Sequence, residues 1–490
     1  MRRRYEEVGA LAVLAVCLAT LAYPRLAPGI CFDDPGDLQT ACAVLGIAHP
    51  PGYAGYASLG RLLTWIPGLE PARAVTLACL AAGVGALLLC AAVQIRLGVN
   101  PWLAAAACLP LAWHPRVWVN LVVPEVYAPT WLFTTAAVYL LASHFTREPR
   151  PRGRLPLAFL LLGFAVANRP PTLLFLPGVL LGLLLTRRKG RRTAGETARA
   201  VLLCVAGFAL PVCYCAGFLW IRDTARQPYN YIEARRCADP SLPAADGGAA
   251  AKIGRIWWLV SGREYAAERA GAFHLLDRLR WIGEAAAAGD DALFATAIVA
   301  LVVGGVAARR RSMSTLIVLL GVLLGAIVYL CVYRTYGTAA DMLPLLGAVC
   351  IFAGTALGLL LPGEGGRWRR ALAMLLFALT VVETGRRVRN VPDCTAEYDA
   401  TAYLRSVDFA ALPTDALVLT DWRKNAALHY ALLTQTKRTD ISVLYLSPER
   451  WPEYARRYAG QGGSVYLSGP ISAPVGAVLE SAGGLWRLEF

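Results

Sequence analysis

The sequence predicts an α-helical polytopic membrane protein of about eleven transmembrane helices with a small C-terminal soluble α/β domain. The 490-residue chain is 57% hydrophobic and 17% charged, whereas soluble proteins have roughly 45–50% apolar and about 25% charged residues. Its apolar residues come in blocks of roughly 17–23 residues, the length that a helix needs to cross the hydrocarbon core. Short arginine clusters separate the blocks.

Apolar blocks fall at residues 8–24, 72–93, 101–114, 122–143, 155–168, 171–186, 200–221, 291–308, 314–333, 342–361 and 370–384. The third and fifth are short for a crossing. The first has the basic start and apolar run of a signal peptide, but no convincing small-residue cleavage site precedes Pro24 and Pro28. We interpret it as a retained helix.

The arginine clusters predict the orientation, because cytoplasmic connections carry an excess of basic residues. The clusters occupy alternate connections, at 2–4, 96, 147–154, 187–192, 309–311 and 367–370. We therefore expect a cytoplasmic N-terminus and an extracytoplasmic C-terminal domain, in the plasma or inner membrane if the source is bacterial. The same bias explains the net charge of +15, so we expect membrane lipids and no nucleic acid as partners.

The outer side would then hold segments 25–71, 114–124 and 222–290 and the tail. Within 222–290, "KIGRIWWLVSGREY" and "FHLLDRLRWIG" combine tryptophans with arginines and indicate helices that lie in the membrane interface. Most of the thirteen cysteines lie inside apolar blocks and are typical of small buried side chains. No zinc-type cysteine spacing is present.

The chain divides into a transmembrane module at 1–385 and an extracytoplasmic α/β domain at 386–490. In the tail, "ALVLTDW" and "ISVLYLS" flank the helical "RKNAALHYALLTQ", a strand–helix–strand pattern. "SVYLSG" and "LWRLEF" could add strands. We expect this domain to help recognise an acceptor and to contribute no catalytic group.

Three carboxylates, Asp33, Asp34 and Asp37, follow the first apolar block. One such acid is ordinarily a solvated loop residue or a helix cap, and Asp37 could cap the next helix. A turn at Pro35–Gly36 would point two carboxylates into one cavity, where their mutual repulsion would raise the pKa of one of them. A raised pKa would suit that group to act as a general base. They could instead hold a divalent cation, although the sequence does not require one. The sequence does not identify a metal or another cofactor.

Four further polar residues are expected on the same side. His49 precedes two prolines that prevent a helix from continuing. Glu125 lies at the entry to an apolar block, where an acid normally faces a protein cavity. Arg169 and Arg334 lie at outer helix ends and could pair with phosphate oxygens, or could extend to lipid headgroups instead.

The stretch "DDPGDLQTACAVLGIAHPPGYAGYASLGRL" resembles the opening signature of a large family of polytopic membrane proteins, formerly of unknown function. That signature reads roughly D-S-G-E, a small-residue helix, then L-G-I-A-H-P-P-G-Y-P. The family includes an animal protein O-mannosyltransferase and is grouped with the GT-C glycosyltransferases. "HPRVWVNLVVPEVYAPTWLF", "ANRPPTLLFLPG" and "TDWRKNAALHYALLTQTKRTDISVLYL" resemble its later segments. Asp37 replaces the glutamate of the pattern, and Ala54 replaces its proline.

The resemblance implies a GT-C fold and an acid in the first outer loop that acts as the catalytic base. It also implies transfer of a sugar, such as mannose, from a polyprenyl-phosphate donor to a hydroxyl of a protein or glycan acceptor, with inversion. Such a transfer needs a base and cations that stabilise the departing phosphate. Asp34 or Asp37 fits the first role, and Arg169 or Arg334 fits the second.

Two other functions remain open. A lipid or solute transporter, including a flippase, would have broken polar helices at the midplane and internal repeats, and we find no convincing repeat. A membrane scaffold that presents the tail to a partner would leave the acid cluster unexplained.

Overall fold

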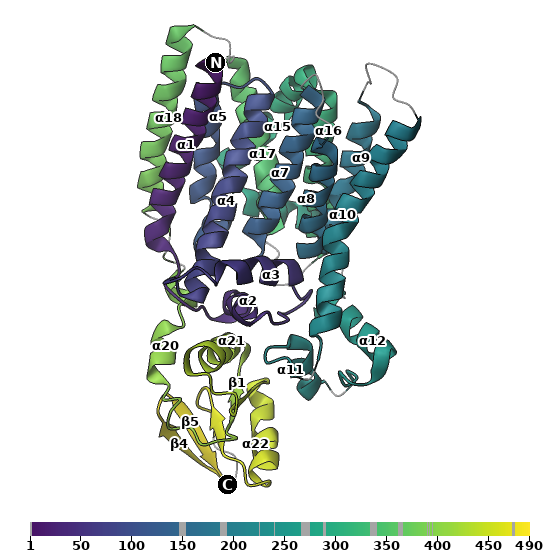
Figure 1. Ribbon diagram of the computed structural model, residues 1–490. Helices are drawn as coiled ribbons and strands as arrows, with labels where there is room; N and C mark the ends of the chain where they lie inside the picture. The colour runs from purple at the N-terminus through teal and green to yellow at the C-terminus, as the bar shows by residue number, and fades with distance from the viewer. Residues whose placement is uncertain are drawn as a thin grey trace.

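A computed structural model describes residues 2–490 except 147–152, 187–193, 225, 240, 266–274, 288–290, 334–340, 361–365, 390, 392, 394 and 473–475. Long helices form a bundle, short helices lie across one of its ends, and a sheet unit lies beyond them (Figure 1). The N-terminus is at the far end of the bundle and the C-terminus is in the sheet unit (Figure 1). The short helices therefore separate the bundle from the sheet.

Every expected apolar block coincides with a helix. The bundle contains α1 (Arg2–Ala22), α4 (Pro71–Arg96), α5 (Pro101–Cys108), α7 (Tyr127–Thr146), α8 (Arg154–Asn168), α9 (Leu176–Leu184), α10 (Ala194–Arg222), α15 (Asp291–Arg311), α16 (Met313–Val332), α17 (Leu343–Leu360) and α18 (Arg367–Val388). The 3-10 helices η2 (Leu109–Trp113) and η3 (Pro170–Phe175) complete the third and sixth blocks.

Fewer helices than the expected eleven are long and apolar enough to cross a membrane. Within the described residues four helices qualify, at Arg3–Arg25, Pro71–Arg96, Ala194–Arg222 and Met313–Val332. A bent pair, α6 (Pro115–Val122) with α7, makes a fifth if it counts as one span. Several other apolar helices have only 10–17 residues. The count of about eleven is therefore not confirmed.

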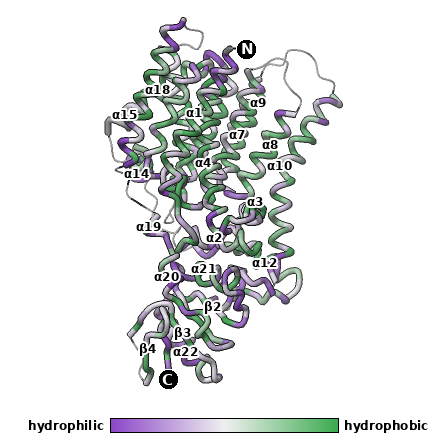
Figure 2. Tube along the Cα trace, turned by 60° about the vertical axis from the view of Figure 1, so that its left-hand side comes forward, coloured by the Kyte–Doolittle hydropathy of each residue, from purple (hydrophilic) through white to green (hydrophobic). Residues whose placement is uncertain are grey.

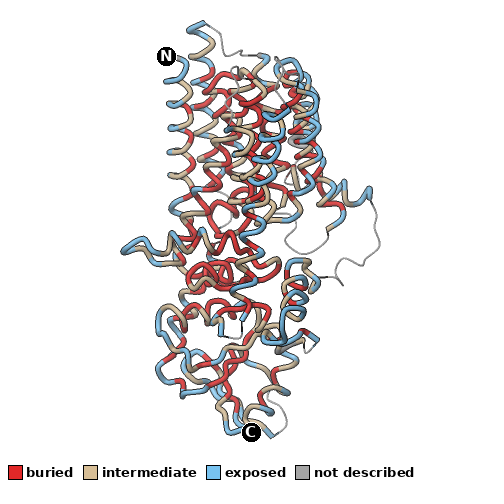
Figure 3. Tube along the Cα trace, turned by 45° about the vertical axis from the view of Figure 1, so that its right-hand side comes forward, coloured by how far each residue is buried: buried red, intermediate tan, exposed pale blue. Residues whose placement is uncertain are grey.

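The bundle has an apolar exterior as well as an apolar core. The tube is predominantly hydrophobic along the bundle (Figure 2), and large apolar side chains such as Leu184, Ile221 and Val382 are exposed. Buried segments gather inside the bundle and at its junction with the sheet unit (Figure 3). Apolar exposure on this scale is typical of a surface that faces lipid.

Small residues let helices approach each other inside the bundle. Gly178 of α9 faces Gly321 of α16, and a Cβ on either would collide with the other backbone. Without water to drive apolar association, membrane helices depend on such close packing.

The end of the bundle that faces the sheet unit carries α2 (Asp33–Val44), α3 (Ala54–Leu63), α11 (Tyr231–Ala238), α12 (Gly248–Val260) and α14 (Leu275–Ala286). Helices α12 and α14 fall on the two stretches that predicted interfacial helices, and Trp257 of α12 is exposed. Helix α3 exposes Leu59 and Leu62, with Trp65 just beyond its end.

The turn expected at Pro35–Gly36 is wrong, because both residues lie in the first turns of α2. Proline is tolerated there, since the first N–H groups of a helix have no partner within it. Asp37 is consequently inside α2 and does not cap it. Asp34 and Asp37 are three residues apart, a spacing that brings helical side chains to one face.

The tail contains a five-stranded sheet in the order β2-β1-β3-β5-β4. Strand β1 (Leu417–Thr420) is parallel to β2 (Ser442–Tyr445) and β3 (Val465–Leu467). Strand β5 (Leu485–Glu489) is antiparallel to β3 and to β4 (Val478–Ala482). The helices of the tail are α19 (Thr395–Tyr398), α20 (Thr401–Ser406), α21 (Trp422–Tyr430) and α22 (Trp451–Ala459).

Helix α21 joins the sheet unit to the bundle. It packs on α2, where Thr40 Oγ1 donates to the carbonyl of Ala426 at 3.0 Å. The hydroxyl of Tyr430 accepts the Ala72 N–H at 3.2 Å. One apolar cluster includes Ala43 of α2 together with tail residues. The division of the chain at 385/386 into separate domains stays a prediction.

The described basic residues of the connections gather at the N-terminal end. Arg370 pairs with Glu6 at 3.1 Å and Arg96 approaches Glu7 at 3.9 Å. The Arg311 guanidinium lies beside Gly98. Both ion pairs join α1 to connections that the sequence analysis assigned to one side.

Because basic connections stay cytoplasmic, we expect a reporter fused at residue 190 to be cytoplasmic and reporters fused at 240 and 440 to be extracytoplasmic. Accessibility of cysteines introduced at the same positions provides a second measurement. If positions 190 and 440 lie on the same side, the orientation is wrong.

Gly36→Ala is expected to destabilise the protein, because a Cβ at Gly36 would collide with the carbonyl oxygen of Cys31. Overpacking of this kind costs roughly 1–3 kcal/mol. Gly9→Ala in α1 is the matched control, since nothing lies near its added methyl. Thermal unfolding in detergent should fall for the first variant only; equal melting temperatures would refute the close contact.

Candidate active site

Asp37 is buried at the end of the bundle that faces the sheet unit. Its side chain has no exposed surface. One carboxylate oxygen accepts the backbone N–H of His49 at 2.9 Å and lies 2.6 Å from the His49 ring Nδ1. The other accepts the hydroxyl of Tyr229 at 2.5 Å. Burial of a carboxylate is costly unless donors replace water, and these three groups do so.

His49 lies between two acids. Its ring is buried, with Nδ1 on Asp37 and Nε2 3.7 Å from a carboxylate oxygen of Asp34. Burial alone lowers the pKa of His49. The charge of Asp34 and the hydrogen bond that His49 donates to Asp37 outweigh burial and raise this pKa to about 9. The imidazole is therefore protonated at neutral pH, and both of its nitrogens can donate.

Asp34 is the open carboxylate of the pair. About half of its side-chain surface, 49%, is exposed. One oxygen accepts the indole N–H of Trp422 at 2.8 Å, and Trp422 begins α21 directly after β1. A substrate hydroxyl could reach Asp34, whereas Asp37 has no accessible surface. The sequence left the choice between these acids open.

Asp33 points toward a different partner. Its carboxylate lies 3.6 Å from the guanidinium of Arg423 in the tail. Asp34 and Asp37 therefore share His49 as a partner, whereas Asp33 is directed at the tail.

Glu125 lies in the connection between α6 and α7. Its backbone oxygen accepts from Cys79 Sγ at 3.5 Å. Its carboxylate is near enough to His49 to contribute to the raised pKa of the imidazole. The structure thus brings Glu125 to the group that contains Asp34, Asp37 and His49.

Arg169 follows the last residue of α8 and already has a carboxylate partner. Its Nη2 lies 2.5 Å from an oxygen of Asp341. Its Nη1 donates to the Tyr53 hydroxyl at 3.2 Å, and the Tyr53 ring meets the His49 ring edge-on with centroids 5.0 Å apart. Tyr53 thus links Arg169 to His49. A phosphate that bound Arg169 would compete with Asp341. Arg334 lies outside the described residues.

The loop before α11 holds Tyr229 in place. The backbone of Ile47 pairs on both sides with this loop, donating to Tyr229 O at 2.9 Å and accepting from Tyr231 N at 3.0 Å. One residue, Ala48, separates Ile47 from His49. The same backbone pairing therefore positions both donors to Asp37.

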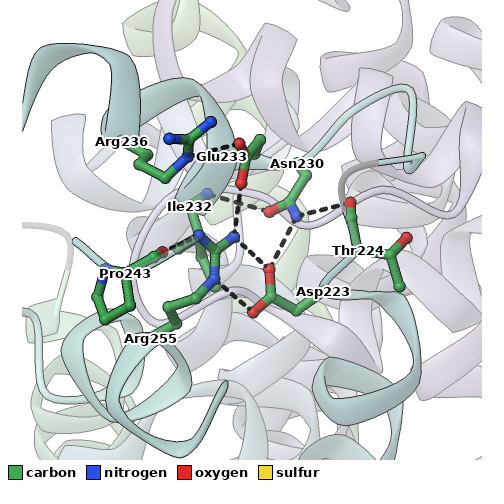
Figure 4. Close-up of polar contacts among 8 residues, drawn as sticks. All are labelled: Asp223, Thr224, Asn230, Ile232, Glu233, Arg236, Pro243 and Arg255. Atoms are coloured by element: carbon green, nitrogen blue, oxygen red, sulfur yellow. Dashed lines mark hydrogen bonds and ion pairs between the residues drawn. The ribbon is translucent and has the colours of Figure 1, made fainter. Parts of the chain in front are cut away.

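A buried ion-pair network centred on Arg255 of α12 also holds the loop before α11. Arg255 of α12 has no exposed surface and donates to both oxygens of Asp223 at 2.7 and 2.9 Å and to Glu233 at 3.0 Å (Figure 4). Asn230 also donates to Asp223 at 2.9 Å. Removal of one partner of a buried pair leaves an uncompensated charge, so the network ties α10, α11 and α12 together.

Within the described ranges, no group of three or more histidine, cysteine, aspartate or glutamate side chains is arranged to hold a metal ion. The acids that could have shared a cation have protein partners instead. The Asp37 carboxylate in particular is occupied by His49 and Tyr229.

Sequence reasoning missed Tyr229, Trp422 and Asp341. Trp422 offered one signal, since it follows a predicted strand within "ALVLTDW", where the carboxyl ends of parallel strands commonly form sites. It was nonetheless assigned to a tail without a part in catalysis, and the structure places its indole on Asp34. Tyr229 and Asp341 carried no local pattern.

The N-terminal part of the chain matches a known family. Residues 34–192 match the family model of the protein O-mannosyl-transferase TMEM260 N-terminal domain. The match begins at Asp34 and includes Asp37, His49, Glu125 and Arg169. No protein of curated function matches the chain in sequence.

The fold is similar to those of solved GT-C glycosyltransferases. One is the archaeal oligosaccharyltransferase AglB from Archaeoglobus fulgidus in complex with an inhibitory peptide and a dolichol-phosphate, with TM-score 0.54 and 12% identity over 95% of this chain and 69% of that one. Another is ArnT from Cupriavidus metallidurans bound to undecaprenyl phosphate, with TM-score 0.52 and 11% identity over 98% and 97%. These proteins share the fold of this chain, and the family match covers residues 34–192.

The raised pKa of His49 predicts a pH dependence of stability. The folded-state pKa of about 9 lies above the ordinary 6.5, so the ion pairs of the imidazolium stabilise the protein fully below pH 6.5. This contribution is lost as the pH rises through 9, and it is on the order of 3 kcal/mol.

Thermal unfolding of the wild type and His49→Gln in detergent measures this effect, because the difference between them cancels the titrating groups that do not interact with His49. We expect the wild type to lose its advantage between pH 6.5 and 9.5. An advantage that stays constant over this interval would mean that His49 is neutral in the folded protein.

Proposed function

We propose that this protein is a membrane glycosyltransferase that moves a sugar from a polyprenyl-phosphate donor to a hydroxyl of a protein or glycan acceptor on the non-cytoplasmic face. The observation that carries the proposal is the half-exposed Asp34 carboxylate beside the buried Asp37–His49 pair. It lies at the junction of an apolar bundle and a sheet unit, where a lipid-linked donor and an aqueous acceptor can meet. Mannose is the sugar that the family match favours.

Asp34 is the proposed general base. It accepts the proton of the acceptor hydroxyl while the hydroxyl oxygen forms a bond to the anomeric carbon of the sugar. The bond between that carbon and the phosphate oxygen breaks with inversion, and polyprenyl phosphate leaves with its negative charge. The indole of Trp422 orients Asp34 from one side, and a hydrogen-bonded carboxylate in a fixed position is what general-base catalysis needs.

The buried acid has a positioning role. Asp37 keeps His49 charged and oriented, and His49 in turn lies 3.7 Å from Asp34. The positive charge of an imidazolium at this place stabilises the negative charge that develops on the phosphate as polyprenyl phosphate leaves. Arg169 adds positive charge that stabilises the same phosphate, although Asp341 balances part of this charge.

The proposal is tested with purified protein, radiolabelled polyprenyl-phosphate sugars and acceptor extracts, with sugar transfer as the readout. Asp34→Asn keeps the size of the side chain and its contact with Trp422 but cannot accept a proton. We expect this variant to lose about 100- to 10,000-fold in rate.

Asp33→Asn is the matched control, because it removes the neighbouring charge and leaves the Asp37–His49 pair intact. Its activity should stay within a few-fold of the wild type. If Asp34→Asn is as active as Asp33→Asn, Asp34 is not the base. If no donor sugar is transferred by the wild type, the proposed function fails.

A further inference from the structure

A crevice opens at the end of the bundle that is remote from the sheet unit. It lies between α1, α5 and α18, which run side by side (Figure 1), and it has a volume of about 770 Å³. Charged residues (Glu6, Arg367 and Arg370) and apolar residues line it together. The crevice shares no residue with the candidate active site, which lies at the opposite end of the bundle.

The crevice narrows toward the sheet unit because α1 and α18 converge. A Cβ on Gly385 of α18 would lie 4.0 Å from a methyl of Leu21 in α1, whereas a Cβ on Gly9 of α1 would have nothing within 4 Å. Trp102 of α5 forms the third wall, and its ring packs against Phe377 of α18 with centroids 5.4 Å apart. The three helices therefore leave an open wedge at their N-terminal ends.

The charged part of the crevice carries more positive than negative charge. Arg370 pairs with Glu6 at 3.1 Å. Arg367 lies three residues earlier on α18, is exposed, and has no ion-pair partner among the residues that the structure describes. The crevice thus has one guanidinium beyond the one that its carboxylate neutralises. A guanidinium can bind two phosphate oxygens through parallel hydrogen bonds.

The apolar part of the crevice continues from the charged part toward the middle of the bundle. Gly9, Ala371 and Met374 line it, and exposed apolar side chains such as Val13 and Leu375 follow on the same two helices. Apolar surface of this kind faces lipid in a membrane bundle. A ligand that fills the whole crevice therefore needs both an anionic head and an apolar tail.

This combination favours an acidic phospholipid over other anions and other lipids. A free phosphate would use the charged part alone and leave the apolar wall open. A zwitterionic headgroup brings a cation of its own, which the exposed Arg367 repels, whereas a net negative headgroup matches the excess positive charge. Basic pockets between transmembrane helices on the cytoplasmic side bind acidic headgroups, and the arginine clusters predict that this end of the bundle is cytoplasmic.

We infer that the crevice between α1, α5 and α18 binds one acidic phospholipid, with its phosphate held by Arg367 and Arg370 and an acyl chain along the apolar wall. The site goes beyond the proposed function, because it lies at the opposite end of the bundle from Asp34 and holds neither sugar donor nor acceptor. The bound lipid connects α1 to α18 at the end where these helices are apart.

The test measures binding of fluorescent phosphatidylglycerol to the full chain in detergent micelles, against three unlabelled competitors. These are phosphatidylglycerol, phosphatidylcholine with the same acyl chains, and soluble glycerol 3-phosphate. We expect phosphatidylglycerol to compete at least about tenfold better than either of the others, since only it has both the net charge and the tail. Equal competition by phosphatidylcholine would overturn the acidic headgroup, and equal competition by glycerol 3-phosphate would overturn the lipid.

The charged part is tested with Arg367→Gln, which removes the unpaired guanidinium and leaves the Arg370–Glu6 pair in place. Arg309→Gln is the matched control, because Arg309 is in the last turn of α15 and does not line the crevice. We expect Arg367→Gln to weaken binding of phosphatidylglycerol at least about tenfold and Arg309→Gln to change it about twofold or less. Equal affinities of these two variants would overturn the inference.

The apolar part is tested with Gly9→Leu, whose added side chain enters open space and occupies the crevice. Val8→Leu is the matched control, since Val8 is exposed on the same helix and does not line the crevice. We expect only Gly9→Leu to weaken lipid binding, again by about tenfold or more. Equal affinities would refute the position of the acyl chain. If Gly9→Leu instead turns a dimer into a monomer and the wild type binds no lipid, a second copy fills the crevice and the inference is wrong.

Discussion

The junction between the bundle and the sheet unit depends on one carboxylate, that of Asp37, which is removed from water and must accept hydrogen bonds from protein donors. Those donors come from His49, which is 12 residues from Asp37 in the sequence, and from Tyr229, which is 192 residues away. Because a buried carboxylate without donors is costly, both segments must dock for its oxygens to have hydrogen-bond partners. The backbone pairing of Ile47 with the Tyr229 loop brings both donors to the same place.

Helical spacing gives the two acids different environments. Asp34 and Asp37 lie on one face of α2, one turn apart, but the first is at the helix start beside solvent and the second is inside. His49 contacts the buried acid through one ring nitrogen and approaches the open acid with the other. The buried pair therefore stabilises a cation next to a carboxylate that a substrate can reach, which is an arrangement suited to proton transfer beside a departing phosphate.

Hydrophobic blocks and a strand–helix–strand pattern were enough to predict the bundle helices, α21 and four of the five strands, because these depend on local periodicity. Strand β4 and helix α22 were not predicted. The number of crossings is not confirmed, since several apolar helices are short. The same local reasoning located Asp34, Asp37, His49 and Glu125, which the structure brings together. It could not supply Trp422, which is 388 residues from Asp34, because such a contact follows from the docking of α21 on α2. The expected Pro35–Gly36 turn was wrong because proline is equally suited to the start of a helix.

The shorter acid at position 37 has a physical explanation in this arrangement. The family signature has a glutamate there, and an aspartate could have left the carboxylate a methylene short of its partners. Here both oxygens of Asp37 are within hydrogen-bonding distance of donors, and the side chain has no free surface. A glutamate would have to place an extra methylene in a closed space, which costs roughly 1–3 kcal/mol unless neighbours move. His49 and Tyr229 thus lie close enough to α2 for an aspartate side chain to contact both of them. The shorter acid keeps these contacts because its partners are close, and a longer side chain is not needed.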